Sequence, residues 1–181
     1  ENAAYNYHKQ MVGSGSAWST SDGQQMLWDA ERTPVTMIAY APYMSEAAPD
    51  ASLAVNALTN QATEENVKSS DFLLMKATVD PEQDLTADGK LKISLSHAMS
   101  KLIIKITVNG TTDAAMNKLG DMSINGAVVN GICDLSATVP MVVPAPDAVV
   151  ATVAPYKGTE SCECILPPQK IAEGFSVNFS Y

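Results

Sequence analysis

His97 is the one histidine in a patterned stretch of the chain, and any nucleophile–base pair would have to include it. It lies next to Ser96 and near Ser100, so a hydroxyl nucleophile is at least within reach along the chain. The sequence has no Gly-x-Ser-x-Gly elbow, no HExxH motif and no glycine-rich phosphate loop after a strand. Because His97 falls on the apolar face of an alternating stretch, we interpret it as a buried structural pin that hydrogen-bonds irregular backbone at residues 97–101. We therefore predict that the protein is not an enzyme.

The cysteines and carboxylates do not form a metal motif. Cys162 and Cys164 are two residues apart, so on a strand they share a face and cannot easily bridge each other, and zinc sites use more ligands at wider spacing. Structural or free thiols remain open, as does a bridge from Cys133 to one of this pair. Asp80, Asp84 and Asp88 are four residues apart rather than at alternate positions, and the glutamate that completes an EF-hand loop does not follow. We expect no metal and no cofactor.

Composition limits the classes of partner. Hydrophobic residues make up 46% of the 181 residues and charged residues 17%, which is typical of a folded chain with a substantial core. The net charge of −9, with no basic cluster, argues against nucleic acid. No apolar run reaches the roughly 20 residues needed to span a bilayer. The sequence opens at Glu1 without a signal segment, which leaves the compartment open.

The stretch Leu91–Val108 organises the predicted fold. Its apolar residues occupy odd positions up to Met99 and even positions from Leu102 onward. Side chains alternate strictly along a strand, so this change of parity requires a bulge, a bend or a short break. We expect two consecutive strands, or one bent strand that serves two sheets, with Ile103 buried on the other face.

The rest of the chain reads as short strands joined by turns. Residues 45–70 are expected to be loop with one short element, and residues 112–119 a two-turn helix. Asn-Gly turns are expected at 125–126 and 130–131, which is typical of a sandwich or barrel. The acidic segment 81–90 is predicted to link a domain at 1–80 to one at 91–181. Strands are expected at 33–44, 71–79, 122–129, 132–139, 162–166 and 175–181, with an edge strand within 140–155.

Three aromatic residues are candidate ligand contacts. Trp18 and Trp28 stand in a polar, loop-rich segment, and Tyr43 follows the strand at 33–44. An aromatic platform would suit a glycan or a protein partner, but large aromatics are more often part of a core. We favour the core for the two tryptophans and keep the binding platform as the alternative.

Several pieces of the sequence occur in a specific order. They are Trp18 and Trp28 ahead of a strand, IAYAPY at 38–43, SDFLL at 70–74 with KAT at 76–78, SLSHAMSKL at 94–102, and ILPPQ at 165–169. In this order they resemble the fimbrillin (Mfa-like, type V pilin) family of Bacteroidales surface proteins. The most specific piece is His-Ala-x-Ser-Lys-Leu after an alternating strand. The resemblance extends over most of the chain.

The resemblance implies an all-β fold of two tandem transthyretin-like β-sandwich domains, Greek-key and mostly antiparallel, with one or two short helices. It implies export through the periplasm to the outer membrane as a lipoprotein, held by a lipid anchor outside this chain. It also implies a stalk, tip or anchor subunit of a pilus or fimbria, which adds strands between subunits by donor-strand exchange. Other pilus subunits are then the partners, and a host glycan or protein is a further candidate.

The sequence also departs from the family pattern. The lipidation cysteine and the first strands of the domain at 1–80 are missing, as are the last strands of the domain at 91–181. Arg32, the sole arginine, lies just before a core strand, so we do not assign a maturation cleavage there. The alternative function is a surface-exposed lipoprotein module that binds a glycan or protein through Trp18, Trp28 or Tyr43 and does not polymerise.

Overall fold

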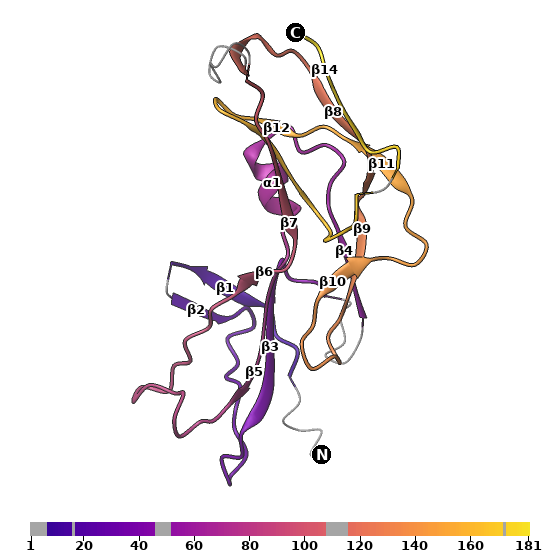
Figure 1. Ribbon diagram of the computed structural model, residues 1–181. Coiled ribbons are helices and arrows are strands. Elements are labelled where there is room, and N and C mark those ends of the chain that lie inside the picture. Colours follow the sequence, from indigo (N-terminus) through magenta and orange to yellow (C-terminus); the bar gives the residue numbers. More distant parts are fainter. Residues whose placement is uncertain (1–6, 16, 46–51, 108–115, 172) are drawn as a thin grey trace.

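The computed structural model describes residues 7–15, 17–45, 52–107, 116–171 and 173–181. These residues form antiparallel sheets and one complete short helix, which confirms the predicted all-β class (Figure 1). No helix among them is long and apolar enough to cross a membrane. The elements are β1 (Met11–Ser14), β2 (Ala17–Thr20), β3 (Val35–Ala41), β4 (Ser52–Asn56), α1 (Glu64–Ser69), β5 (Leu73–Val79), β6 (Ser96–His97), β7 (Ser100–Ile104), β8 (Met122–Val128), β9 (Asn130–Asp134), β10 (Val142–Pro144), β11 (Val150–Val153), β12 (Tyr156–Lys157), β13 (Cys162–Leu166) and β14 (Ser176–Phe179).

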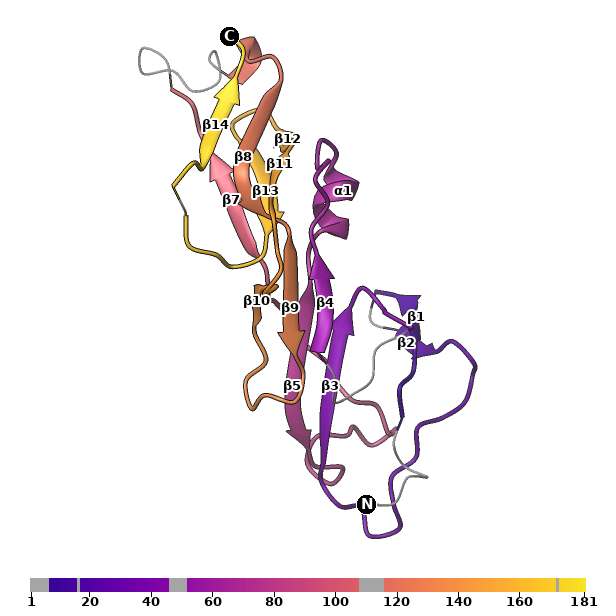
Figure 2. The same ribbon diagram turned by 90° about the vertical axis from the view of Figure 1, so that its right-hand side faces the viewer.

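The molecule is elongated, and its sheets divide between two halves (Figure 2). The upper half contains two three-stranded sheets, ordered β12-β13-β7 and β11-β8-β14. The lower half contains the sheets β3-β5-β6 and β10-β9-β4 and the separate hairpin β1-β2. Strands β8 and β9 are separated by Val129 alone and lead the chain from the upper half into the lower half.

One main hydrophobic core joins the two halves. It contains Leu53 of β4 and Leu74 of β5 from the lower half, and Ile124 of β8 and Leu166 of β13 from the upper half. All four side chains are at most 8% exposed. A smaller cluster at the far end of the upper half consists of Met116, Leu119, Met122 and Cys162. Side chains alternate between the two faces of a strand, so every second residue of these strands points inward. The inward residues of facing sheets meet and form the core.

The parity change in the opening stretch is a switch between sheets. His97 of β6 pairs with Leu73 of β5 in the lower half, whereas Ser100 of β7 pairs with Leu166 of β13 in the upper half. Met99, between the two strands, is buried. Of the two predicted alternatives, the structure shows two consecutive strands, one in each of two sheets. Residues 91–95, in contrast, do not form a strand beyond an isolated bridge of Leu91 to Leu85.

Three other local expectations were wrong. Ile103 is 52% exposed, because it lies on the solvent side of β7. The Asn-Gly pair at 125–126 is not a turn but a bulge inside β8, where Gly126 has φ 76° and the register with β11 shifts. The second pair, at 130–131, begins β9 and is paired with both β4 and β10.

The segment 45–70 has more structure than expected. Within its described part, β4 is followed by α1, whose N-cap is Thr63: the Thr63 hydroxyl accepts a hydrogen bond from Asn66 N. Val67 of α1 is buried in the main core. The predicted helix at 112–119 lies partly outside the described residues. Within its described part, residues 116–118 are helical.

The predicted domain division at 81–90 stays a prediction. The segment is rich in turns, in keeping with a linker. Strand pairing crosses it, however: β4 pairs with β9, and β5 pairs with β6. A boundary at this segment would therefore separate strands that share sheets and a core.

Lys76 ties β5 to the turn that follows β9. Its Nζ donates to the carbonyl oxygens of Leu135 at 2.7 Å, Ala137 at 2.8 Å and Ser136 at 3.3 Å. We expect Lys76→Met to lower the free energy of unfolding by about 1.5 kcal/mol, because hydrogen bonds to a charged group are lost and the carbonyls are left partly unpaired. Urea unfolding measures this. Lys68→Met is the control, because the Lys68 side chain is 79% exposed; equal losses in the two variants would contradict the role of Lys76.

Candidate functional site

One side of the upper half is closed by the chain itself. Only Ala154 and Pro155 separate β11 from β12, so these edge strands of the two sheets are joined along the same side. Val153, which ends β11, is 0% exposed. The opposite side is flanked by β7 and β14, the other two edge strands, and among the described residues no strand pairs with the outer edge of either. We call this side, bounded by β7 and β14, the open side.

The inward residues of β7 are incompletely covered. Leu102 and Ile104 pair in register with Cys164 and Cys162 of β13, both 0% exposed. Leu102 and Ile104 face the same interior but are only half-buried. The apolar interior of the upper half therefore becomes more exposed from its central strand to its β7 edge.

Strand β14 shows the same gradient in the facing sheet. Val177 pairs with Ile124 of β8, which is 0% exposed, and Phe179 pairs with Met122, which is 9% exposed. Val177 itself is half-buried, and Phe179 is 47% exposed. Both edge strands of the open side thus carry partly exposed apolar side chains, whereas the residues paired with them in the central strands are buried.

This combination can accept an extended chain. An edge strand has backbone N–H and C=O groups without a ladder partner on one flank, which another strand can pair with. The half-exposed residues of β7 and β14 would be buried by the alternate side chains of that strand. The geometry of the open side therefore suits the binding of a peptide strand.

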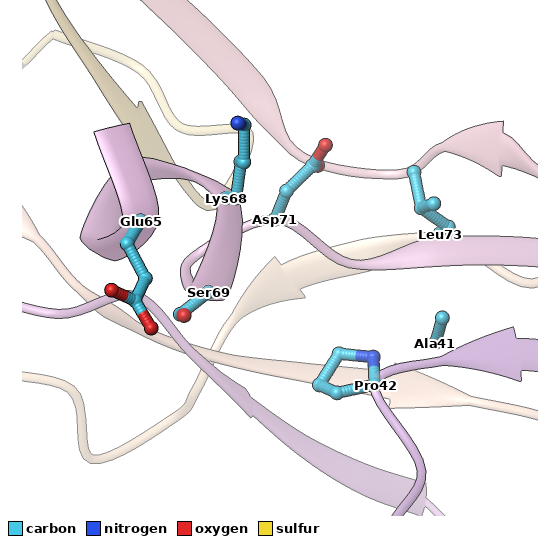
Figure 3. A pocket seen from close by; sticks show the side chains of 7 residues that line it. All are labelled: Ala41, Pro42, Glu65, Lys68, Ser69, Asp71 and Leu73. Carbon is cyan, nitrogen blue, oxygen red and sulfur yellow. The ribbon is translucent and has the colours of Figure 1, made fainter. Parts of the chain in front are cut away.

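A separate depression lies elsewhere on the described surface, where α1 meets the ends of β3 and β5 (Figure 3). It has a volume of about 430 Å³ and is open to solvent. The helix contributes Glu65, Lys68 and Ser69, and Ala41, Pro42, Asp71 and Leu73 complete the lining. None of the predicted ligand-contact aromatics, Trp18, Trp28 and Tyr43, is among these residues.

His97 is not buried, contrary to the prediction. Its side chain is 76% exposed, and its Nδ1 lies 2.5 Å from Oδ2 of Asp71, which is 16% exposed. The ring therefore contacts a carboxylate just before β5 rather than irregular backbone. This contact joins β6 to the start of β5, and the role of His97 as a structural pin stays a prediction.

The three candidate aromatics lie apart from the core. Trp18 is 58% exposed, and its Nε1 donates to Gly15 O across the β1-β2 hairpin. Trp28 is half-buried, and its Nε1 donates to Thr33 O. Tyr43 is 40% exposed, with its ring 5.5 Å from that of His8. The core interpretation was wrong for Trp18, and the half-buried Trp28 belongs to neither core cluster. Ligand contact stays a prediction for all three aromatics.

All three cysteines are buried and unbridged in the structure. Burial raises the pKa of each thiol, and for Cys164 it raises the pKa to about 12. At pH 8 only roughly one Cys164 thiol in ten thousand would be the reactive thiolate. We expect iodoacetamide to label Cys164 at least about 100-fold more slowly in the native protein than in urea, as followed by mass spectrometry. Rapid native labelling of Cys164 would show that its burial is incomplete.

The raised pKa of Cys164 also has a consequence for stability. Its pKa in the folded protein, about 12, lies above the ordinary value of 9.0. The stability that this thiol contributes is therefore fully present below pH 9 and is lost as pH rises toward 12.

The open side was not found from the sequence. Alternation identified β7, β13 and β14 as strands with apolar faces, but it does not reveal which strands lie at an edge. One local signal was available. Residues 175–181 alternate apolar and polar side chains without charge, whereas an exposed edge is commonly protected by lysine, proline or a bulge.

The comparisons with known proteins agree with this fold. A family model described as fimbrillin-like matches residues 1–180. A crystal structure of a "putative cell adhesion protein" from Bacteroides uniformis ATCC 8492 has a TM-score of 0.66 at 18% identity, covering 96% of this chain and 66% of that chain. A second, with the same description, from Bacteroides ovatus ATCC 8483 has a TM-score of 0.56 at 20% identity, covering 93% of this chain and 58% of that chain. No curated protein matches the chain.

Proposed function

Because the chain belongs to the fimbrillin-like family, we propose that it is a structural or adhesive subunit of a cell-surface pilus. The observation that carries this proposal is the open side, where two edge strands leave apolar residues half-exposed. Its partners are other pilus subunits, each contributing an extended segment. Whether the subunit is a stalk, tip or anchor is a matter of which neighbours it accepts.

Assembly proceeds by addition of a strand at the open side. The incoming strand pairs its backbone with the outer edge of β7 or β14, and its alternate side chains cover residues such as Ile104 and Val177. Covering several half-exposed side chains accounts for affinity, since burial of apolar area contributes roughly 25 cal/mol per Å². The proposed cellular location is the outer surface of the bacterium. The protein would reach it through the periplasm and be held there by a lipid anchor on a segment outside this chain.

Hydrogen exchange with a model strand tests this proposal. The probe is the alternating peptide Lys-Thr-Val-Thr-Val-Thr-Val-Thr-Lys, and the control is Lys-Thr-Thr-Val-Val-Val-Thr-Thr-Lys, which has the same composition without alternation. We expect the alternating peptide to slow amide exchange at residues 100–106 or 176–179 at least about tenfold, with no such effect from the control. Protection confined to β11 and β12, or equal protection by both peptides, would refute strand addition at the open side.

Exposed aromatics support a second candidate function. Trp18 at 58% exposure and Tyr43 at 40% exposure are available for stacking on a sugar ring or a partner side chain. In this alternative the chain is a surface module that binds glycan or protein and does not polymerise. Quenching of tryptophan fluorescence by a glycan panel, abolished in Trp18→Ala, would favour it, whereas filaments seen by electron microscopy of the full-length protein would favour the pilus subunit.

A further inference from the structure

A small apolar cavity lies at one end of the open side. Its volume is about 130 Å³, and it is formed between the start of β7 and the segment that follows β13. Its apolar lining comes from Leu102, Leu166, Pro167 and Ile171. For comparison, an apolar cavity of about 150 Å³ holds a benzene molecule. One aliphatic side chain of valine, leucine or isoleucine size would fill the cavity.

The inner wall of this cavity is firmly held. Leu166 is 5% exposed, and Pro167 is fully buried. Gln169 also lines the cavity, and its side-chain amide pairs with the backbone of Val128 as a neighbouring strand would. Its Oε1 accepts from Val128 N, and its Nε2 donates to Val128 O, both at 2.8 Å. These two bonds fix residues 167–169 between the two sheets, so the inner wall is preformed.

The outer wall is different, because nothing in the described structure covers it. Ile171 is 66% exposed although it lines the cavity, and Leu102 on the β7 side is half-buried. Burying Ile171 would therefore require an atom group from outside the described chain. The charge at the rim is already neutralised, since Lys101 Nζ lies 2.6 Å from Glu163 Oε2. An uncharged apolar group would therefore suit this cavity better than a charged one.

We propose that this cavity receives one aliphatic side chain of the strand that another pilus subunit adds at the open side, and that it thereby sets the register of the added strand. This inference rests on the proposed function. It adds the place on the open side, the cavity, that fixes the register in which the incoming strand pairs. A slip of one residue would present the opposite face of the incoming strand, with its polar side chains, to Leu102 and Ile104. Filling the cavity favours the register that avoids this.

A guest series of peptides tests the proposal. The probes are Lys-Thr-X-Thr-Val-Thr-Val-Thr-Lys and its reverse order, Lys-Thr-Val-Thr-Val-Thr-X-Thr-Lys, with glycine, valine, leucine or tryptophan as X. In one of the two orders we expect leucine to bind at least about tenfold more tightly than glycine, as one buried side chain supplies. Tryptophan should bind more weakly than leucine, because it exceeds the cavity. A flat apolar surface would instead favour tryptophan, which has the largest area.

Matched variants assign the effect to the cavity. Ile171→Ser should reduce the preference for leucine over glycine to about threefold or less, whereas Val139→Ser, at an equally exposed valine away from the open side, should leave it unchanged. Both residues are exposed, 66% and 72%, so both variants should fold. If every guest binds alike, or tryptophan binds best, the cavity does not set the register while strand addition stands. If no peptide of either order binds, strand addition at the open side fails, and the register proposal fails with it.

Discussion

Replacing Gln61 by leucine is expected to lower the free energy of unfolding by about 4 kcal/mol, because three hydrogen bonds of a buried side chain are lost. Gln61 is 0% exposed. Its Nε2 donates to the carbonyl oxygens of Leu58 and Ile165, and its Oε1 accepts from Ile165 N, all at 2.8 Å. Leucine has a similar size but offers none of these bonds. The N–H and C=O of Ile165 would remain buried without partners, at about 1–3 kcal/mol each.

Gln169 provides a matched comparison within the same fold. Its side chain makes the same pair of bonds to Val128 but is only half-buried. Water can therefore replace the amide, and Gln169→Leu should cost about 1.5 kcal/mol. Urea unfolding followed by circular dichroism measures both variants. Equal losses would mean that the burial of Gln61 does not decide its contribution.

Gln61 also shows what could not be predicted from the sequence. In sequence it is one polar residue in an alanine-rich segment, and nothing local indicates that its partner is Ile165, 104 positions away. Only the tertiary fold, which places the segment before α1 against β13, creates a buried site for a side-chain amide. Long-range polar contacts of this kind have no periodic signature, whereas the strands around them do.

The strands were predicted where alternation is strong. Cys162–Leu166 was predicted with the same bounds as β13, and the parity change after Met99 correctly indicated a switch between sheets. The Asn-Gly pair at 125–126 misled, because the positive φ that such a pair favours also serves a bulge, as it does at Gly126. Local backbone preference does not distinguish the two when the flanking strands are apolar.

The candidate site was harder to predict than the strands. The exposure of His97 and the burial of Gln61 depend on which strands lie next to each residue. The order of strands in the sheets is a property of the whole chain, so local sequence does not predict it. The sequence indicated an assembly function only through the family resemblance. The open side is marked by a difference in burial between inward residues of neighbouring strands, such as the half-buried Ile104 and the fully buried Cys162.

Two isoleucines that face the same interior are expected to respond very differently to truncation. Ile124 is 0% exposed in the central strand β8, between Val153 of β11 and Val177 of β14. Ile124→Ala should lower the free energy of unfolding by about 4 kcal/mol, within the range for a fully packed site. Ile104 is half-buried at the β7 edge. Ile104→Ala should lower the free energy of unfolding by only about 1.5 kcal/mol, because less apolar area is buried there. Urea unfolding again provides the measurement.

The alternating peptide should change this comparison if strand addition buries Ile104. A bound strand stabilises only the folded state, by an amount set by its concentration relative to its Kd. Ile104→Ala removes part of the surface that the strand covers, so we expect about five-fold weaker peptide binding. Ile124→Ala, whose side chain the strand cannot reach, should bind the peptide as the unmodified protein does, once the folded fraction is accounted for. Equal affinities for the two variants would mean that the exposed face of Ile104 is not where the strand binds, and the gradient of burial across β7 would need another explanation.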